Sequence, residues 1–127
     1  MSETESSGVP VVLHFVGGRT ERVFASPEID SDRQTVVVQQ ENGSSVEVAF
    51  AELKAVFFLA RADTPPAPIP GGSTLAVEFV DGELIRGITS GYNPSGSGFY
   101  LFPHDRSKND RVFVVNSAVV SIDVEKL

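Results

Sequence analysis

Two stretches of the sequence, VVLHFVGGRTERVFAS at residues 11–26 and LAVEFVDGELIRGITS at residues 75–90, follow one pattern. In each, two apolar runs flank a glycine-containing turn at the spacing of a two-residue β-hairpin. A shift of 64 positions aligns the stretches with five identical residues in sixteen. The identical pairs are Phe15/Phe79, Val16/Val80, Gly18/Gly82, Arg22/Arg86 and Ser26/Ser90. The sequence therefore predicts an internal repeat that starts with a hairpin.

The repeat extends to the end of each copy. With an offset of 66, Val46 aligns with Val112, Val48 with Val114 and Leu53 with Val119. Apolar periodicity and turn residues predict five short strands in each copy, with one helical turn before the fifth. The expected strands cover residues 9–16, 19–25, 35–40, 45–49 and 54–59, then 74–80, 83–90, 99–102, 111–115 and 119–124. Five strands in this order are typical of a small Sm-like barrel.

A proline-rich segment separates the two copies. Four prolines fall within the six positions 65–70, and such a segment cannot pair in a sheet interior. We therefore predict an all-β chain with a flexible tail at 1–8, one five-stranded Sm-like small-barrel unit at 9–60, a Pro-rich linker at 61–72 and a second unit at 73–127. Units of this size have small cores and free strand edges, so self-association as a homodimer is plausible.

Composition limits the classes of function. The chain has 17 acidic and 10 basic residues, a formal charge of −7, and no cysteine. An acidic surface repels nucleic acid, because binding to phosphates depends on Lys and Arg. We expect no nucleic-acid binding, no disulfide, no membrane insertion and no secretory signal, and hence a cytoplasmic protein.

Several segments together resemble a known bacterial domain of unknown function. They are LAVEFVDGELIRG from Leu75, GYNP from Gly91, GFYLFP from Gly98 and RVFVVNSA from Arg111, with KAVFF from Lys54 before them. That domain is a short β-rich module found alone or attached to signalling and regulatory proteins. The resemblance covers mostly residues 53–122 and implies a regulatory or adaptor context. It implies no catalytic residue.

The loop NPSGSG, which begins at Asn93, resembles half of the signature of PilZ domains, which are small barrels that bind cyclic di-GMP. This resemblance implies a nucleotide site formed by Asn93, Ser95 and Gly98. The other half of that signature is an Arg-x-x-x-Arg segment, and the sequence upstream of the loop contains none. The alternative hypothesis is therefore a cyclic dinucleotide sensor. The simpler interpretation of this segment is a polar Gly/Ser loop.

Candidates for catalysis or metal binding are few. His14 and His104 are the only histidines. We expect His14 on the solvent face of its strand, and His104 lacks the convergent partners that catalysis requires. Asp105, Asn109 and Asp110 are interleaved with basic residues and lack the closing Glu of a calcium loop. We therefore expect no enzymatic activity, no catalytic residue, no cofactor and no metal.

The most promising residues for recognition lie in loops at one end of the second unit. In a barrel of this topology the loops after the second and fourth strands share one end, which predicts that Tyr92 and Asn93 lie near Asn116 and Ser117. An exposed tyrosine can anchor a protein partner. The sequence thus favours a non-enzymatic adaptor or assembly module that binds another protein through these loops or through its sheet edges.

Overall fold

The computed structural model describes residues 8–60, 71–89, 91–92 and 94–125, and within them it is an all-β protein. Two single turns of 3-10 helix, η1 (Phe50–Glu52) and η2 (Asn116–Ala118), each precede a strand. The strands are β1 (Val9–Phe15), β2 (Thr20–Ala25), β3 (Thr35–Gln39), β4 (Ser45–Ala49), β5 (Leu53–Leu59), β6 (Ser73–Phe79), β7 (Leu84–Thr89), β8 (Gly98–Pro103), β9 (Asn109–Val115) and β10 (Val119–Glu125). The predicted all-β class and the ten predicted strands are confirmed, with boundaries that differ by a few residues.

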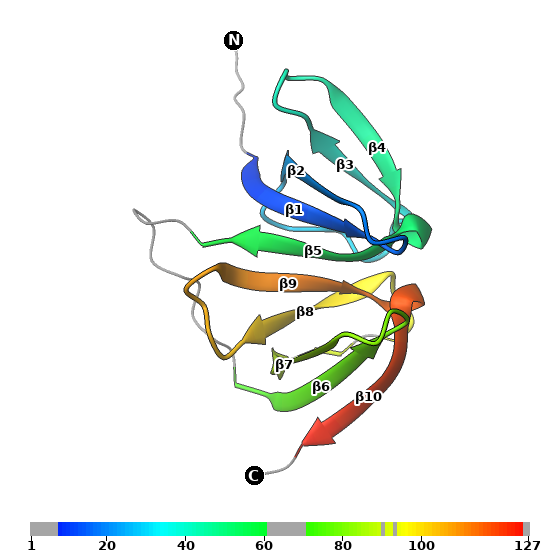
Figure 1. Cartoon of the computed structure of the whole chain (residues 1–127), viewed down its shortest axis with the longest axis vertical. Coiled ribbons are helices and arrows are strands. Elements are labelled where there is room, and N and C mark those ends of the chain that lie inside the picture. The colour runs from blue at the N-terminus through cyan, green and yellow to red at the C-terminus, as the bar shows by residue number, and fades with distance from the viewer. Residues whose placement is uncertain (1–7, 61–70, 90, 93, 126–127) are drawn as a thin grey trace.

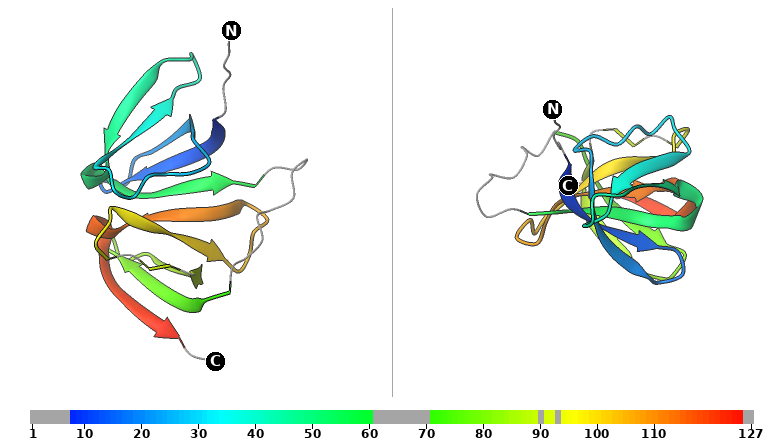
Figure 2. Two further views of the ribbon diagram at one scale, coloured as in Figure 1. Left: turned by 180° about the vertical axis from the view of Figure 1, so that it is seen from behind. Right: turned by 90° about the horizontal axis from the view of Figure 1, so that it is seen from above.

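All ten strands belong to one open antiparallel sheet with the order β10-β6-β7-β8-β9-β5-β1-β2-β3-β4. We expected two barrel units joined by a spacer, whereas the central strands β5 and β9 pair directly and make the sheet continuous (Figure 1). The view from behind also shows β5 and β9 side by side (Figure 2). The predicted tail at 1–8 and linker at 61–72 fall almost wholly outside the described residues, and the domain boundaries stay a prediction.

Strands β1–β5 form the first half of the sheet and β6–β10 the second, and both halves have the same internal order. Their registers also agree. His14 faces Ala55 in the first half as Glu78 faces Ser121 in the second, and a bulge follows on each side. The first turn of each half contains a glycine with positive φ, Gly18 at 98° and Gly82 at 89°, which only glycine adopts without strain.

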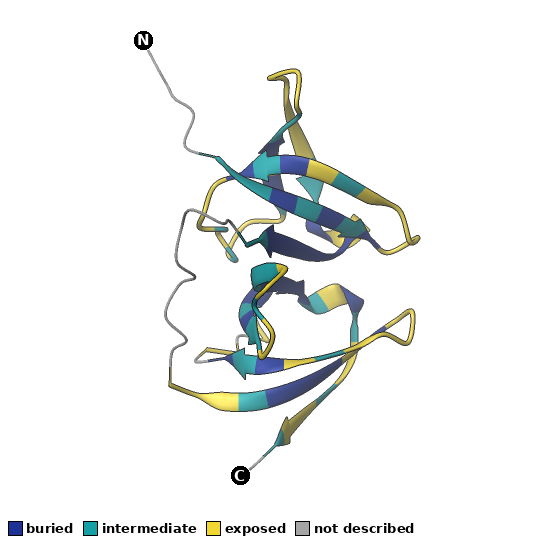
Figure 3. Cartoon of the chain, turned by 60° about the vertical axis from the view of Figure 1, so that its left-hand side comes forward, coloured by how far each residue is buried: buried dark blue, intermediate teal, exposed yellow. Residues whose placement is uncertain are grey.

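Two hydrophobic cores lie on either side of the central pair of strands. Because successive side chains of a strand point to opposite faces, β5 and β9 each contribute to both cores. Val56 of β5 packs with Phe113 of β9 in the first core, whereas Phe57 of β5 packs with Val112 of β9 in the second. Buried residues are concentrated along these strands, and exposed residues on the outer strands and turns (Figure 3). Each half therefore completes the core of the other.

Candidate functional site

The loop at residues 91–97 contains most of the recognition residues expected from the sequence. The Tyr92 side chain is 47% exposed, and its ring meets the Phe99 ring edge-on with centroids 5.0 Å apart. The Asn116 side chain donates a hydrogen bond of 2.9 Å to the carbonyl of Gly96, which fastens this loop to η2. Ser117 is exposed beside it. The structure thus brings Asn116 to the loop, and Asn93 lies outside the described residues.

The residues expected to bind a nucleotide have different surroundings. Ser95 is exposed in the same loop, whereas Gly98 is buried at the start of β8. A Cβ at Gly98 would lie 2.1 Å from the carbonyl oxygen of Val114, so strand packing alone accounts for this glycine. Arg33 lies near the loop through its backbone carbonyl, which accepts a hydrogen bond from Ser97. Its guanidinium group faces Asp30 at 3.5 Å, and the cyclic dinucleotide hypothesis stays a prediction.

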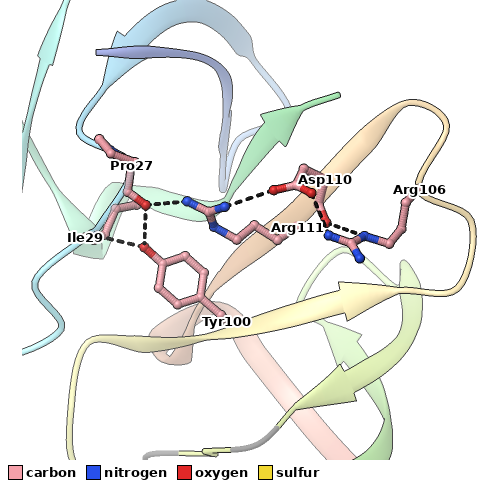
Figure 4. A network of polar contacts seen from close by, with 6 residues as sticks. All are labelled: Pro27, Ile29, Tyr100, Arg106, Asp110 and Arg111. Carbon is pink, nitrogen blue, oxygen red and sulfur yellow. Dashed lines mark hydrogen bonds and ion pairs between the residues drawn. The ribbon is translucent and has the colours of Figure 1, made fainter. Parts of the chain in front are cut away.

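A polar network fastens the loop at residues 26–34 of the first half to the second half (Figure 4). The backbone N–H of Ile29 donates a hydrogen bond of 2.7 Å to the hydroxyl of Tyr100 on β8. Arg111 on β9 donates to the carbonyl of Pro27. Burial raises the pKa of the Tyr100 phenol, so this hydroxyl stays protonated at neutral pH. These contacts fix how the two halves are placed relative to each other.

Arg111 is held from several directions. Its guanidinium carbon lies 4.3 Å from the centroid of the Phe58 ring and 5.2 Å from that of Tyr100. The Asp110 carboxylate lies 2.9 Å from Arg111 and 2.5 Å from Arg106. Asp110, one of the three candidates for calcium, is therefore bound to two guanidinium groups. Among the described residues, no group of three or more His, Cys, Asp or Glu side chains could hold a metal ion.

A buried lysine joins the halves at a second point. The ammonium group of Lys54 on β5 lies 2.8 Å from the Asp81 carboxylate and also contacts Glu83, both in the turn between β6 and β7. Burial by itself would lower the pKa of Lys54, but its hydrogen bonds to Asp81 and Glu83 outweigh this and raise it. The same hydrogen bond lowers the pKa of Asp81. The sequence does not predict this cluster, because no local feature marks Lys54 as buried.

The two histidines have different environments. The expectation that His14 lies on the solvent face was wrong, because its side chain is half-buried and its ring lies 4.2 Å from that of Phe57. Burial and, next, the charge of Lys54 lower the pKa of His14, so it is neutral at pH 7. Val12, on the same face of β1 as His14, packs against the second core. His104 is exposed after β8.

The outermost strands of the sheet, β4 and β10, offer edges for pairing. Within the part of the chain that the structure describes, each pairs on one side only. The hydrogen bonds from Gln40 N to Ser44 O and from Phe50 N to Gln34 O fix the alternation along β4. By that alternation, the backbone groups of Ser45, Glu47 and Ala49 point away from β3. Outward-pointing N–H and C=O groups are a template for another strand.

The free edges match the two strands that meet at the centre. By strand order and register, β4 corresponds to β9, and β10 corresponds to β5. Phe113 of β9 is 1% exposed and Phe57 of β5 is 9% exposed, and the matching positions at the edges hold Glu47 and Asp123. Apolar side chains nevertheless remain uncovered near both edges. They are Val37, Val46, Val120 and Val124, which are 37–61% exposed.

A comparison with family profiles places the whole of this sheet in one family. Residues 8–126 match the profile of the family of unknown function DUF6982. The chain belongs to that family. Membership agrees with the resemblance of its segments to a domain of unknown function, and the match spans both halves. Neither the search of curated proteins nor that of solved structures gave a match. Among the described residues, none forms a helix with the length and apolar character needed to cross a membrane.

Proposed function

We propose that this member of DUF6982 is a non-enzymatic protein-binding module that takes up a strand of another protein at the free edges of its sheet. We further propose that it serves as an adaptor or assembly module in bacterial regulation and works in the cytoplasm, in keeping with its lack of cysteine. Each half is, in this proposal, a variant of a five-stranded Sm-like unit. The loop carrying Tyr92 and the turn at Asn116 and Ser117 add a second contact surface.

One observation carries the proposal: inside the chain, such an edge already receives a strand. The fourth strand of the second half, β9, pairs with the fifth strand of the first half, β5, through Val56 and Phe113 among others. The matching fourth strand of the first half, β4, lacks this partner among the described residues. Addition of a strand to an exposed edge is a general mode of peptide recognition, in which main-chain hydrogen bonds give affinity and alternate side chains give specificity.

The proposal is tested by changing the outward backbone of β4 while leaving its core face intact. Ser45→Pro removes an N–H that points away from β3, near the start of the strand, where proline is tolerated. Ser45→Ala removes the same hydroxyl and keeps the N–H. We expect the immobilised wild-type protein and Ser45→Ala to capture the same partner from a bacterial lysate, and Ser45→Pro to lose it. Equal capture by all three proteins would contradict binding at the β4 edge.

A further inference from the structure

We infer that the strand received by β4 has a basic side chain opposite Glu47 and apolar side chains on either side of it, and that it does not come from a second copy of this chain. This inference rests on the proposed function, because it names the chemistry of the partner at one of the proposed edges. Five observations support it: the register of the β5–β9 pairing, the surroundings of Glu47, the exposure of Val46 and Val48, the residues of β10, and the charge of the chain.

The central joint, which is the pairing of β5 with β9 in the middle of the sheet, supplies the register for a strand added to β4. In it Val56 of β5 faces Phe113 of β9, Phe57 faces Val112, and Ala55 faces Val114. The offset of 66 between β4 and β9 places Glu47, Val46 and Val48 of β4 at the positions of Phe113, Val112 and Val114. A strand added to β4 in the same way therefore sets one residue opposite Glu47 and its two neighbours opposite valines.

The surroundings of Glu47 select the charge of the facing residue. Its carboxylate accepts a hydrogen bond of 2.7 Å from the hydroxyl of Thr35, and Val37, which faces it on β3, is 59% exposed. A strand laid against β4 would lie beside the Glu47 carboxylate and displace water from it, while Val37 already limits water on the β3 side. Burying a carboxylate without a cation is unfavourable, whereas a Lys or Arg opposite it supplies the charge partner.

The flanking positions select apolar side chains. Val46 is 37% exposed and Val48 is half-buried, although both face the first core. The matching Val112 and Val114 are completely buried at 1% and 0% exposure because β5 lies beside them. Apolar residues of an added strand would cover the two valines of β4 in the same manner and remove their apolar surface from water.

A second copy of the chain fits this edge poorly. Its β10 corresponds to β5, so in the same register Ile122 would face Glu47 and Asp123 would face Val46. Both carboxylates would then be buried against apolar neighbours without a cation. In the central joint the same two positions hold Phe113 and Phe57. Polar residues at these edge positions resemble the polar outer faces of the terminal units in repeat proteins.

The wider electrostatic field favours the same partner. Glu41 is exposed in the turn that leads into β4, and the chain as a whole has a formal charge of −7. A basic segment is attracted to such a surface and an acidic segment is repelled, which raises the rate of association of the former.

The probes that test this inference are two synthetic peptides with the sequence of β5, residues 53–59. One carries Val56→Lys and the other Val56→Glu, so that the facing residue is basic or acidic and all else is equal. Binding to the full-length protein is followed by backbone amide shifts in NMR and by titration calorimetry. We expect the Lys peptide to shift the amides of β4 and to bind about tenfold more tightly than the Glu peptide.

Two variants of the protein test whether the preference between the peptides depends on Glu47. Glu47→Lys should reverse the preference between the peptides. Glu28→Lys changes the net charge equally at an exposed position in the loop at 26–34, and should leave the preference in place. Equal binding of both peptides at β4 would overturn the inference and leave strand addition standing. Failure of both peptides to shift the amides of β4 would overturn the inference and the proposed function at this edge. A separate light-scattering measurement tests the second copy: end-to-end association of wild-type chains would overturn its exclusion.

Discussion

The central joint between β5 and β9 and the free edges at β4 and β10 are built from corresponding strands, yet one is closed and the others are open. The joint buries Phe57 and Phe113, and polar contacts from Tyr100, Arg111 and Lys54 surround it. At the edges, Asp123 and Glu47 take the places of the two phenylalanines. Two side chains on corresponding strands thus distinguish an edge that pairs within the chain from one that has no further strand beside it among the described residues.

The largest effect is expected from removing the phenylalanine that β9 contributes to the first core. Phe113→Ala should lower the free energy of unfolding by about 3–5 kcal/mol, because it leaves a cavity beside Phe50 and Tyr100. Glu47→Ala at the matching edge position should change it by less than about 0.5 kcal/mol. Urea unfolding measures both. Similar losses in the two variants would contradict the difference drawn between joint and edge.

The next effect concerns the tight approach of β8 to β9. Gly98→Ala should destabilise the fold by roughly 1–3 kcal/mol, because the added methyl group meets the carbonyl of Val114 at 2.1 Å and the ring of Phe113 at 2.7 Å. Gly17→Ala is the matched control, since a Cβ there has no atom within 4 Å and its φ is not positive. Thermal unfolding of the two variants compares them. If Gly98→Ala is as stable as Gly17→Ala, the approach of these strands is looser than described.

A third change should make the free edges resemble the joint. The double variant Glu47→Phe with Asp123→Phe restores at each edge the side chain found at the centre. We expect it to associate end to end, which size-exclusion chromatography with light scattering would detect as masses above that of one chain. Each single variant keeps one carboxylate in the contact and should associate less. A double variant that stays at the mass of the wild type would show that other residues limit growth.

The smallest effect is a dependence of stability on pH. The pKa of Asp81 is lowered in the folded protein. Asp81 therefore contributes to the free energy of unfolding at neutral pH, and this contribution is lost as the pH falls below the usual aspartate pKa of about 4. The pKa of Lys54 is raised in the folded protein, so its effect is seen at alkaline pH. The contribution of Lys54 to the free energy of unfolding is lost as the pH rises through that raised pKa, above about 10.4. In Lys54→Met the unfolding free energy should depend less on pH in both ranges. Urea unfolding at pH 3, 7 and 11 tests this, and parallel curves for the variant and the wild type would contradict it.

Much of the local structure could be predicted from the sequence, and the reason is that it depends on neighbouring residues. Apolar periodicity and turn residues such as Asp81-Gly82 located ten strands, and the alignment that pairs Phe15 with Phe79 anticipated the common register of the halves. The candidate site was harder to predict from the sequence. The edges were expected, but which strands form them depends on the pairing of β5 with β9.

The sequence by itself determined the strands and their hairpins, because these follow from residue type and spacing. Only the tertiary structure decided that β5 meets β9, and with it the burial of Lys54 and His14 and the need for glycine at position 98. These features depend on contacts between residues far apart in the chain. Periodicity shows which face of a strand is apolar, but not which strand will cover it.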